Sequence, residues 1–369
     1  MISAYFRGIW RLMKQKNNRI FIGYKKEPMK RIFAALFVVF ALTAGSCEKP
    51  EPDPEPEPHS TAFAKGADVS WVTQMEKEGC RFYDASGTQT ECMALLKSLG
   101  MNAIRLRVWV NPTSGWCGKD DVLAKAKRAQ ALGMRLMIDF HYSDWWADPG
   151  KQNKPAAWKN LDLEGLKKAV ADHTTDILQA LKAAGITPEW IQIGNETTGG
   201  MLWPDGQNYT DAGFANYVQL HNAGYDAAKA VFPSASVMVH VDNGWKWETL
   251  KWFFSSFDIK GARYDLIGLS LYPEKFNWQS FNQQILSNIQ TLYSQYGKET
   301  IICEVGMEWT DANTCKNFLS DLITRAQATD SHCTGVLYWE PEGYHSWSHY
   351  SKCAFDNNGK PTIALDAFK

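Results

Sequence analysis

The sequence predicts a single (β/α)8 barrel, a TIM barrel with long βα loops that form a substrate cleft. Three observations predict this fold. Short apolar stretches recur eight times from residue 63 onward, stretches with helical spacing separate them, and helical stretches end at glycine. Strands alternating with helices favour parallel βαβ units, and eight units in about 310 residues fit a closed barrel.

The expected strands follow in order along the chain. They are the stretches 66–72, 102–110, 135–143, 189–196, 236–244, 264–273, 300–308 and 334–342. The helical stretches between them include DDVLAKAKRAQALG and LEGLKKAVADHTTDILQALKAAG. A doubly wound open sheet is the alternative architecture, but no glycine-rich phosphate-binding fingerprint follows the first strand.

The segments before the barrel have other tasks. Residues 1–28 are basic and are interpreted as a misassigned leader, so translation is expected to start at Met29. Residues 29–47 combine a basic start, a short apolar run and small residues before Cys47, which predicts a lipoprotein signal peptide. Residues 48–60 form a spacer rich in proline and glutamate, and residues 61–369 form the catalytic barrel.

Composition limits the class of partner. A formal net charge of −1 gives no electrostatic footprint for nucleic acid, so nucleic acid is excluded as a partner. The chain has 16 Trp, and exposed indole rings stack on flat apolar ligand faces, although most are expected in the core. The lipid-bearing Cys47 and the acidic tract after it resemble surface-exposed lipoproteins of Gram-negative bacteria. We therefore expect an exported outer-membrane lipoprotein on the cell surface, attached only through this anchor.

Alternation along each strand sorts its residues into two faces. In NAIRLRVWV, the aliphatic residues must face the helices, so Arg105, Arg107 and Trp109 point into the barrel. The same reasoning turns a further set of polar and aromatic residues inward: Asp139, His141, Glu196, His240, Asp242, Ser270, Tyr272, Glu304 and Trp339. Most come late in their strands, at the end where barrel active sites lie.

Two of these residues form a catalytic pair. Glu196 ends the fourth strand in WIQIGNE and Glu304 ends the seventh in IICEVG, so both reach the same rim. Glycosidic cleavage needs two carboxylates, one to protonate the leaving oxygen and one to attack or to activate water. A lone inward glutamate is more often a salt-bridged structural residue. The pattern predicts a polysaccharide hydrolase.

Several longer motifs resemble one family. The stretches NAIRLRVWVNP, DFHYSDWWADPGKQNKPAAW, WIQIGNETTGGMLWPDG, DLIGLSLYP, ICEVG and GVLYWEPE are similar to those of endo-β-1,4-galactanases, also called arabinogalactan galactosidases. The resemblance runs from Phe63 to the C-terminus. It implies a retaining glycosidase of the clan with catalytic glutamates on strands four and seven, acting on pectic galactan without a required cofactor.

The resemblance also assigns roles. Glu196 would be the general acid/base and Glu304 the nucleophile, with Asn195 bonded to the sugar 2-hydroxyl. Four residues would position the sugar and the nucleophile, namely Arg105, His141, His240 and Tyr272. Trp339 would form the floor. Four further indoles are expected to stack on sugars because they lie on or near rim loops, namely Trp109, Trp145, Trp146 and Trp203.

Structural readings stay open for several of these residues. Arg107 is equally expected to pair with Asp139 in the barrel interior. His141 and His240 could instead be core histidines. The rim tryptophans could instead pack within the loops. For a retaining mechanism we expect the two carboxyls about 5–5.5 Å apart. We also expect a raised pKa for Glu196, because Glu304 is ionised nearby.

Metal and disulfide expectations come from the last loop. Relatives in the family carry a longer loop tied by calcium, and Asp311, Asn313 and Asp356 could be remnants of that site. No compact ligand spacing supports a metal, so none is assigned. Cys315 and Cys353 both reach the catalytic rim, whereas a helix of about 16 residues separates Cys315 from Cys333. A Cys315–Cys353 disulfide is the expectation, with Cys303 a reduced thiol facing the helices.

Two other functions compete with a galactanase. A β-mannanase or xylanase of the same clan differs in the orientation of one substrate hydroxyl, which spacing does not resolve. A non-catalytic surface lipoprotein that captures glycans is the second alternative, but a binder has no need for two opposed carboxylates. In each case the expected partner is a polysaccharide or oligosaccharide, here β-1,4-galactan, and the chain is expected to be a monomer.

Overall fold

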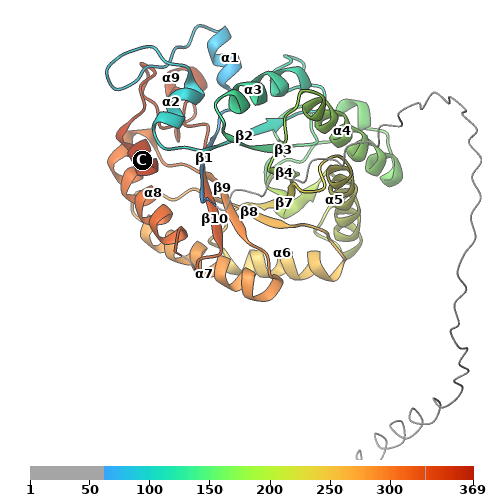
Figure 1. The fold of residues 1–369 in the computed structure, drawn as a ribbon. Helices are drawn as coiled ribbons and strands as arrows, with labels where there is room; N and C mark the ends of the chain where they lie inside the picture. Colours follow the sequence, from blue (N-terminus) through green and yellow to red (C-terminus); the bar gives the residue numbers. More distant parts are fainter. Residues whose placement is uncertain (1–61, 329) are drawn as a thin grey trace, which may run out of the picture. The chain divides into compact units, whose positions relative to one another are not determined.

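Eight parallel strands close into a barrel in a computed structural model that describes residues 62–328 and 330–369. The strand order around the barrel is β1-β10-β9-β8-β7-β4-β3-β2, and every neighbouring pair is parallel. Helices surround this ring of strands (Figure 1). The predicted (β/α)8 barrel is confirmed, and the open sheet is excluded because β1 pairs with β10.

The eight barrel strands begin within two residues of their predicted positions but end earlier. Their bounds are β1 Ala64–Asp68, β2 Ala103–Val108, β3 Arg135–Phe140, β4 Trp190–Ile193, β7 Ser236–Val241, β8 Leu266–Leu271, β9 Thr300–Val305 and β10 Cys333–Trp339. A short antiparallel pair, β5 (Gly200–Met201) with β6 (Gly206–Gln207), follows the fourth barrel strand.

Left-handed residues explain the early ends. Positive φ angles occur just beyond several strands, at Tyr142 (50°), Gly194 (82°), Glu196 (45°), Asn243 (51°) and Glu340 (46°). A non-glycine residue with positive φ is uncommon and concentrates at functional sites. The polar residues predicted as strand ends therefore belong to sharp turns at the barrel rim.

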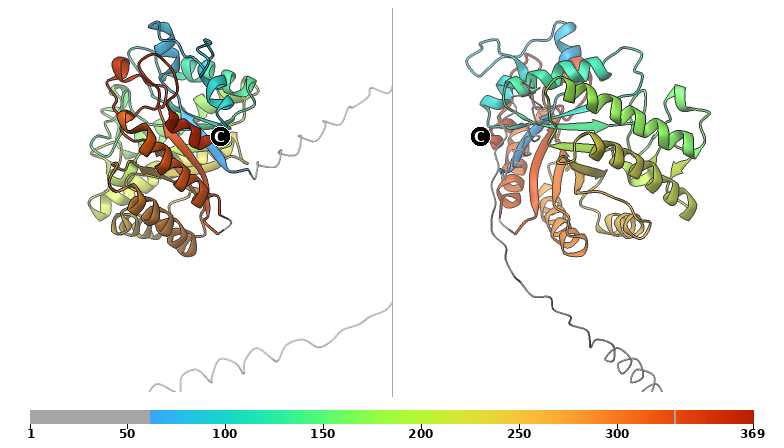
Figure 2. Two further views of the ribbon diagram at one scale, coloured as in Figure 1. Left: turned by 90° about the vertical axis from the view of Figure 1, so that its left-hand side faces the viewer. Right: turned by 45° about the vertical axis from the view of Figure 1, so that its right-hand side comes forward.

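The outer ring consists of α2 to α8 and a C-terminal 3-10 helix at 363–368, with smaller helices in the loops (Figure 2). The bounds are α1 Val72–Lys77, α2 Cys92–Ser98, α3 Lys119–Ala131, α4 Leu163–Ala183, α5 Asp211–Val231, α6 Trp247–Ile259, α7 Trp278–Tyr296, α8 Ala312–Ala326 and α9 His345–Ser348. Short 3-10 helices cover 156–158, 197–199, 309–311 and 363–368. The expected glycine caps are present, since Gly133 and Gly185 follow α3 and α4 with φ of 64° and 70°.

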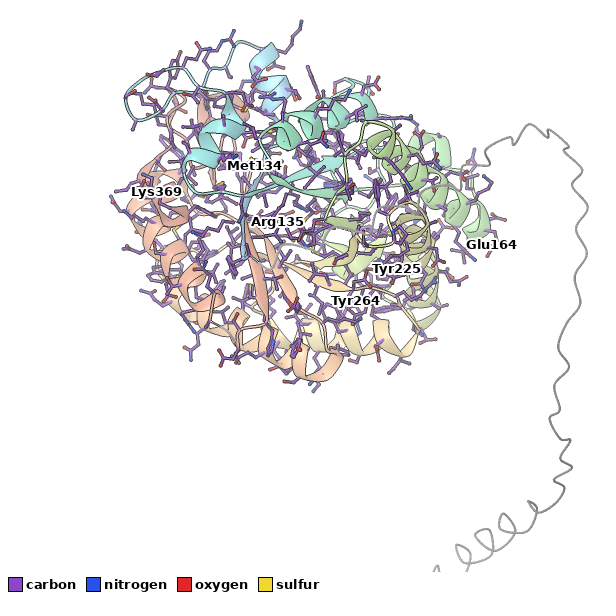
Figure 3. The ribbon with its side chains drawn as sticks, viewed as in Figure 1. Met134, Arg135, Glu164, Tyr225, Tyr264 and Lys369 are labelled. Atoms are coloured by element: carbon purple, nitrogen blue, oxygen red, sulfur yellow. The ribbon has the colours of Figure 1, made fainter. Side chains whose placement is uncertain are left out.

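Nine apolar side chains from all eight strands fill the lower barrel interior. They are Ala64, Ala103, Met137, Trp190, Met238, Leu266, Ile301, Cys303 and Leu337. At the N-terminal ends of the strands, the guanidinium of Arg135 lies 4.4 Å from the centre of the Trp190 ring. Arg135 lies near the centre of the ring of strands in Figure 3, whereas Glu164 points outward from α4. The interior below the rim is therefore a packed core.

A bulge in β9 changes the facing predicted for Cys303. Leu269 of β8 pairs with Ile302, but the next residue, Ser270, pairs with Glu304, so Cys303 is the extra residue. Cys303 belongs to the interior cluster, and Glu304 lies above it at the rim. The prediction that Cys303 faces the helices is wrong, although its thiol is free and buried as expected.

The predicted Cys315–Cys353 disulfide is also wrong. Both side chains are buried free thiols. The sulfur of Cys315 lies 3.8 Å from the Tyr338 hydroxyl, and that of Cys353 lies 3.8 Å from the carbonyl of Phe355. The two thiols therefore face different partners.

The predicted leader, signal peptide and spacer cover residues 1–60 and lie outside the described residues, which begin at residue 62. Within residues 62–328 and 330–369, no helix has the length and apolarity to cross a bilayer.

Candidate active site

Glu196 stands immediately beyond β4 because the chain turns sharply there. Gly194 and Glu196 both have positive φ, and a Cβ on Gly194 would lie 2.5 Å from the Thr197 side chain. This turn directs the carboxyl toward β8, where the Ser270 hydroxyl donates to its Oε1 at 2.8 Å. The left-handed backbone therefore holds a carboxyl over the barrel mouth.

Glu304 comes from the bulged end of β9. Its Oε2 accepts a hydrogen bond from the Tyr272 hydroxyl at 2.8 Å, and its Oε1 lies 2.9 Å from Nη1 of Arg105. The side chain is 4% exposed. A buried carboxylate held by one cation and one hydroxyl has a fixed orientation, as a nucleophile requires.

Both carboxyls line one cavity of about 490 Å³. Its other lining residues are His141, Trp146, Ala147, Asp148, Lys151, Asn195, Tyr272, Trp339, Tyr350 and Lys352. The structure thus brings together six predicted site residues besides Trp339: Glu196, Glu304, His141, Asn195, Tyr272 and Trp146. Arg105 lies behind Glu304 and acts on the cavity through it.

The two carboxyls have different electrostatic surroundings. Burial raises the pKa of Glu196, and the charges of Glu304 and Asp242 raise it further. Burial also raises the pKa of Glu304, to about 7, although Arg105 and the Tyr272 hydrogen bond act in the opposite direction. Because the pKa of Glu196 is raised well above its usual value, a proton shared by the pair favours Glu196. This agrees with the expected raised pKa of Glu196.

A buried network of arginines and acids supports Glu304. Arg105 is fully buried, with Asp68 at 3.0 Å and Asp139 at 2.9 Å as well as Glu304. The predicted Arg107–Asp139 pair is wrong, because Arg107 pairs with Glu340 and lies 3.8 Å from Asp68. The β2–β3 register places Arg107 opposite Asp139, but the Arg107 guanidinium pairs with Glu340 beyond β10, and Asp139 pairs with Arg105.

Replacing Arg105 with methionine is expected to destabilise the barrel strongly. It would leave three carboxylates without their shared cation, and breaking a buried pair costs about 3–5 kcal/mol of unfolding free energy. Urea unfolding at neutral pH measures the loss. Lys168→Met is the control, since its pair with Asp172 is exposed and contributes no more than about 0.5 kcal/mol. Equal losses in the two variants would contradict the network.

A second cavity of about 940 Å³ adjoins the first, and Trp146 lines both. Its aromatic lining is Trp71, Trp109, Trp116, Trp145, Trp146 and Trp347. Trp145 is 57% exposed and lies 4.7 Å from the ring of Trp109, which is itself buried. The predicted rim tryptophans therefore form one aromatic wall, except Trp203.

Trp203 lies outside the lining of both cavities. Its indole N–H donates to the Gly199 carbonyl at 2.8 Å, and its ring packs 6.4 Å from Tyr209. Its predicted stacking on sugars stays a prediction.

The histidines have distinct positions. His141 lines the cavity, with Nε2 3.0 Å from Asp139 and Nδ1 accepting from the Ala147 N–H at 3.2 Å. His240 is fully buried and absent from the cavity lining, and it contacts the backbone N–H of Glu196 instead of the cavity or Glu304. Asn195 accepts from Arg105 at 2.8 Å and donates to the Ala147 carbonyl, which fixes its amide at the cavity edge.

Sequence reasoning missed several residues of the site. Asp68 ends the first strand as a late polar residue, a signal of the kind that identified the others. Trp71 lies in the stretch 66–72, which the sequence predicts as a strand, but the structure ends β1 at Asp68 and turns Trp71 into the second cavity. Tyr350 and Lys352 lie in a loop without periodicity, and no pattern in the sequence points to them.

Metal ligands are not grouped in the described part of the chain. No cluster of three or more His, Cys, Asp or Glu within it could hold an ion. Asp311 lies 3.7 Å from Lys275, and Asp356 accepts from the backbone N–H groups of Asn358 and Lys360. Asp311 and Asp356, which the family resemblance suggested as remnants of a calcium site, therefore each contact groups of the protein itself.

Comparison with known proteins places this geometry in a family. The sequence model of glycosyl hydrolase family 53 matches residues 64–368. A probable arabinogalactan endo-β-1,4-galactanase A of Neosartorya fischeri is 33% identical over 322 residues, which are 80% of this chain and 90% of that protein.

Solved structures agree. A fungal β-1,4-galactanase superposes with a TM-score of 0.76 at 29% identity, over 83% of this chain and 99% of that one. The GH53 catalytic domain of Ignisphaera aggregans gives a TM-score of 0.76 at 28% identity, over 86% and 98% of the two chains. The family match extends over all eight barrel strands and includes both rim carboxylates. This chain belongs to glycosyl hydrolase family 53.

Proposed function

We propose that this protein hydrolyses internal β-1,4-galactosidic bonds of pectic galactan with retention of configuration. The observation that carries the proposal is the pair of carboxyls in one cavity with different partners, Glu196 hydrogen-bonded by Ser270 and Glu304 held by Arg105 and Tyr272. Proteins named as β-1,4-galactanases align over most of the barrel and support the choice of galactan.

In the proposed double displacement, each carboxyl has its own task. Glu304, oriented by Arg105 and Tyr272, attacks the anomeric carbon while Glu196 donates its proton to the departing glycosidic oxygen. The bond to the leaving sugar breaks as the ester to Glu304 forms. Glu196, now ionised, takes a proton from water, and the resulting hydroxide equivalent displaces Glu304 from the anomeric carbon.

The aromatic cavity supports action within chains. It continues from the catalytic cavity past Trp146, is open to solvent at Trp145, and offers indole faces for further sugars. A cleft that accommodates sugars beyond the cleaved bond suits an endo-acting enzyme. The tolerance of arabinose branches and the lengths of the products depend on how many sugars this aromatic wall binds.

Retention of configuration is the expected outcome at the cleaved bond. Proton NMR during early turnover of galactan is expected to show the β-anomer first, with the α-anomer appearing only by mutarotation. If the α-anomer appears first, the enzyme is inverting, and its two carboxyls are expected about 6.5–9.5 Å apart.

Substrate preference separates the competing functions. Pectic galactan is expected to release oligosaccharides, whereas mannan and xylan are expected to release little. Cleavage of mannan or xylan in preference to galactan would favour the other clan enzymes. Binding of galactan with no product from any substrate would favour the non-catalytic glycan-binding lipoprotein.

We also propose that the barrel is monomeric and anchored to the outer membrane through a lipid on Cys47, with residues 48–60 as spacer. The apolar run after Met29 and the small residues before Cys47 support the anchor. Cys47→Ser is expected to move the protein from the membrane fraction to the soluble fraction of cells. Unchanged fractionation would refute the anchor, and light scattering at twice the chain mass would refute the monomer.

A further inference from the structure

Ser270 connects the acid/base to a buried histidine. It is the penultimate residue of β8 and is 1% exposed. Its Oγ lies 2.8 Å from Oε1 of Glu196 and 2.8 Å from Nε2 of fully buried His240. The three side chains form one hydrogen-bonded chain from the barrel interior to the cavity.

The surroundings of Nδ1 fix the direction of this chain. The backbone N–H of Glu196 lies 3.2 Å from Nδ1 of His240, and Nε2 of Gln192 lies 3.1 Å away. Asn195 Oδ1 is 3.0 Å from the same nitrogen, but that oxygen already accepts from Arg105 at 2.8 Å. The two hydrogens of Gln192 Nε2 have closer acceptors in Asp139 Oδ1 at 2.6 Å and the Gly194 carbonyl at 3.0 Å. The backbone N–H of Glu196 therefore makes Nδ1 the acceptor, and the ring proton is on Nε2.

The His240 ring stays neutral in this arrangement. Burial lowers the pKa of His240, and the neighbouring Arg105 and His141 lower it further. A neutral ring protonated on Nε2 donates to Ser270 Oγ. The hydroxyl then has its single proton left for Oε1 of Glu196.

This direction has a consequence for the acid. In a protonated carboxyl, one oxygen carries the hydrogen and the other is the better acceptor. Because Ser270 donates to Oε1, the transferable proton is favoured on Oε2. After the proton has left, the same hydrogen bond stabilises the carboxylate that acts as base.

We propose that Ser270, oriented by His240, is a positioning residue that confines the acid proton to Oε2 of Glu196 and stabilises the carboxylate in the second step. The proposal rests on the acid/base role of Glu196 in the proposed function.

Ser270→Ala tests the proposal through its pH profile on galactan. We expect kcat to fall about 10-fold with KM little changed, because the proton is no longer confined to one oxygen. We also expect the alkaline limb of kcat/KM to move up by about one pH unit, since the carboxylate loses its donor. A packing defect would lower activity without moving this limb.

Two variants serve as controls. Ser270→Thr keeps the hydroxyl and is expected to keep the wild-type limb. Ser143→Ala removes a buried rim hydroxyl that contacts the backbone N–H of Trp145 at 3.4 Å, and is expected to leave the profile unchanged. An unmoved limb in folded Ser270→Ala, or the same shift in Ser143→Ala, would overturn the proposal.

The folded state of each variant is checked by thermal unfolding. If Ser270→Ala does not fold, Ser270→Cys retains a similar side-chain volume with a much weaker hydrogen-bond donor. Its alkaline limb of kcat/KM is expected at a higher pH than that of wild type. A wild-type limb in Ser270→Cys overturns the proposal. A wild-type enzyme inactive on galactan would instead sink the proposed function, so the two failures are distinguishable.

Discussion

Glu304→Ala is expected to lower kcat on galactan by roughly 10⁵-fold or more, the scale of losing a nucleophile. The loss should be equally severe on aryl β-galactosides with good leaving groups, because no ester to the enzyme can form on either substrate. Steady-state rates on both substrates measure it. The aromatic wall and the other residues that line the catalytic cavity remain in the variant, so binding of galactan should persist.

Glu308→Ala is the matched control for this variant. Glu308 lies four residues further along the same segment, where its carboxylate accepts from Ser351 at 2.7 Å and pairs with Lys352 at 3.4 Å. Activity near that of wild type is expected. A Glu304→Ala enzyme that retains activity on the aryl substrate would show that another group attacks the anomeric carbon.

Glu196→Ala is expected to lower kcat/KM on galactan by about 10³-fold, within the usual contribution of a general acid. On an aryl galactoside the first step needs no proton, so the ester on Glu304 should form rapidly and then accumulate. A burst of released phenol followed by slow turnover measures this. The alkaline limb of the pH profile should vanish as well, since it reports ionisation of the acid.

Azide distinguishes the two carboxyl roles. In Glu196→Ala, azide needs no general base, so it should restore turnover and yield a β-galactosyl azide. In Glu304→Ala, the same β-product has no ester to arise from. Rescue of both variants to the same β-azide would contradict the assigned roles.

The apolar periodicity of the sequence predicted the barrel, because burial of the strands determines that periodicity. Apolar strand residues pack on both faces of the sheet, as Ile301 and Ile302 of β9 do, and the apolar pattern identifies such residues directly. Glu196 and Glu304 could be identified because a carboxylate interrupts this pattern at the same rim. The ends of strands were extended too far, because left-handed turns at residues such as Glu340 leave no periodic trace.

The bulge in β9, the partners of the two arginines and the loop residues of the cavity could not be predicted from the sequence. The bulge that turns both Cys303 and Glu304 inward depends on pairing with Ser270 of β8, which alternation within one strand does not contain. The partners of Arg105 and Arg107 likewise depend on the stagger between strands. Loop residues such as Tyr350 reach the cavity through a chain path that has no repeating spacing.

The apolar filling of the barrel interior has a consequence for what the enzyme can synthesise. Nine side chains pack below Glu304, and within residues 62–328 and 330–369 the catalytic cavity lies above this core. The galactosyl ester is therefore approached from the side that the departing sugar has vacated, under Glu196. Water and the hydroxyl of another galactan chain reach it by the same route. The ratio of chain shortening to chain extension is then set by how often a sugar occupies that space before water does, so concentrated oligosaccharide should turn the hydrolase into a transglycosylase.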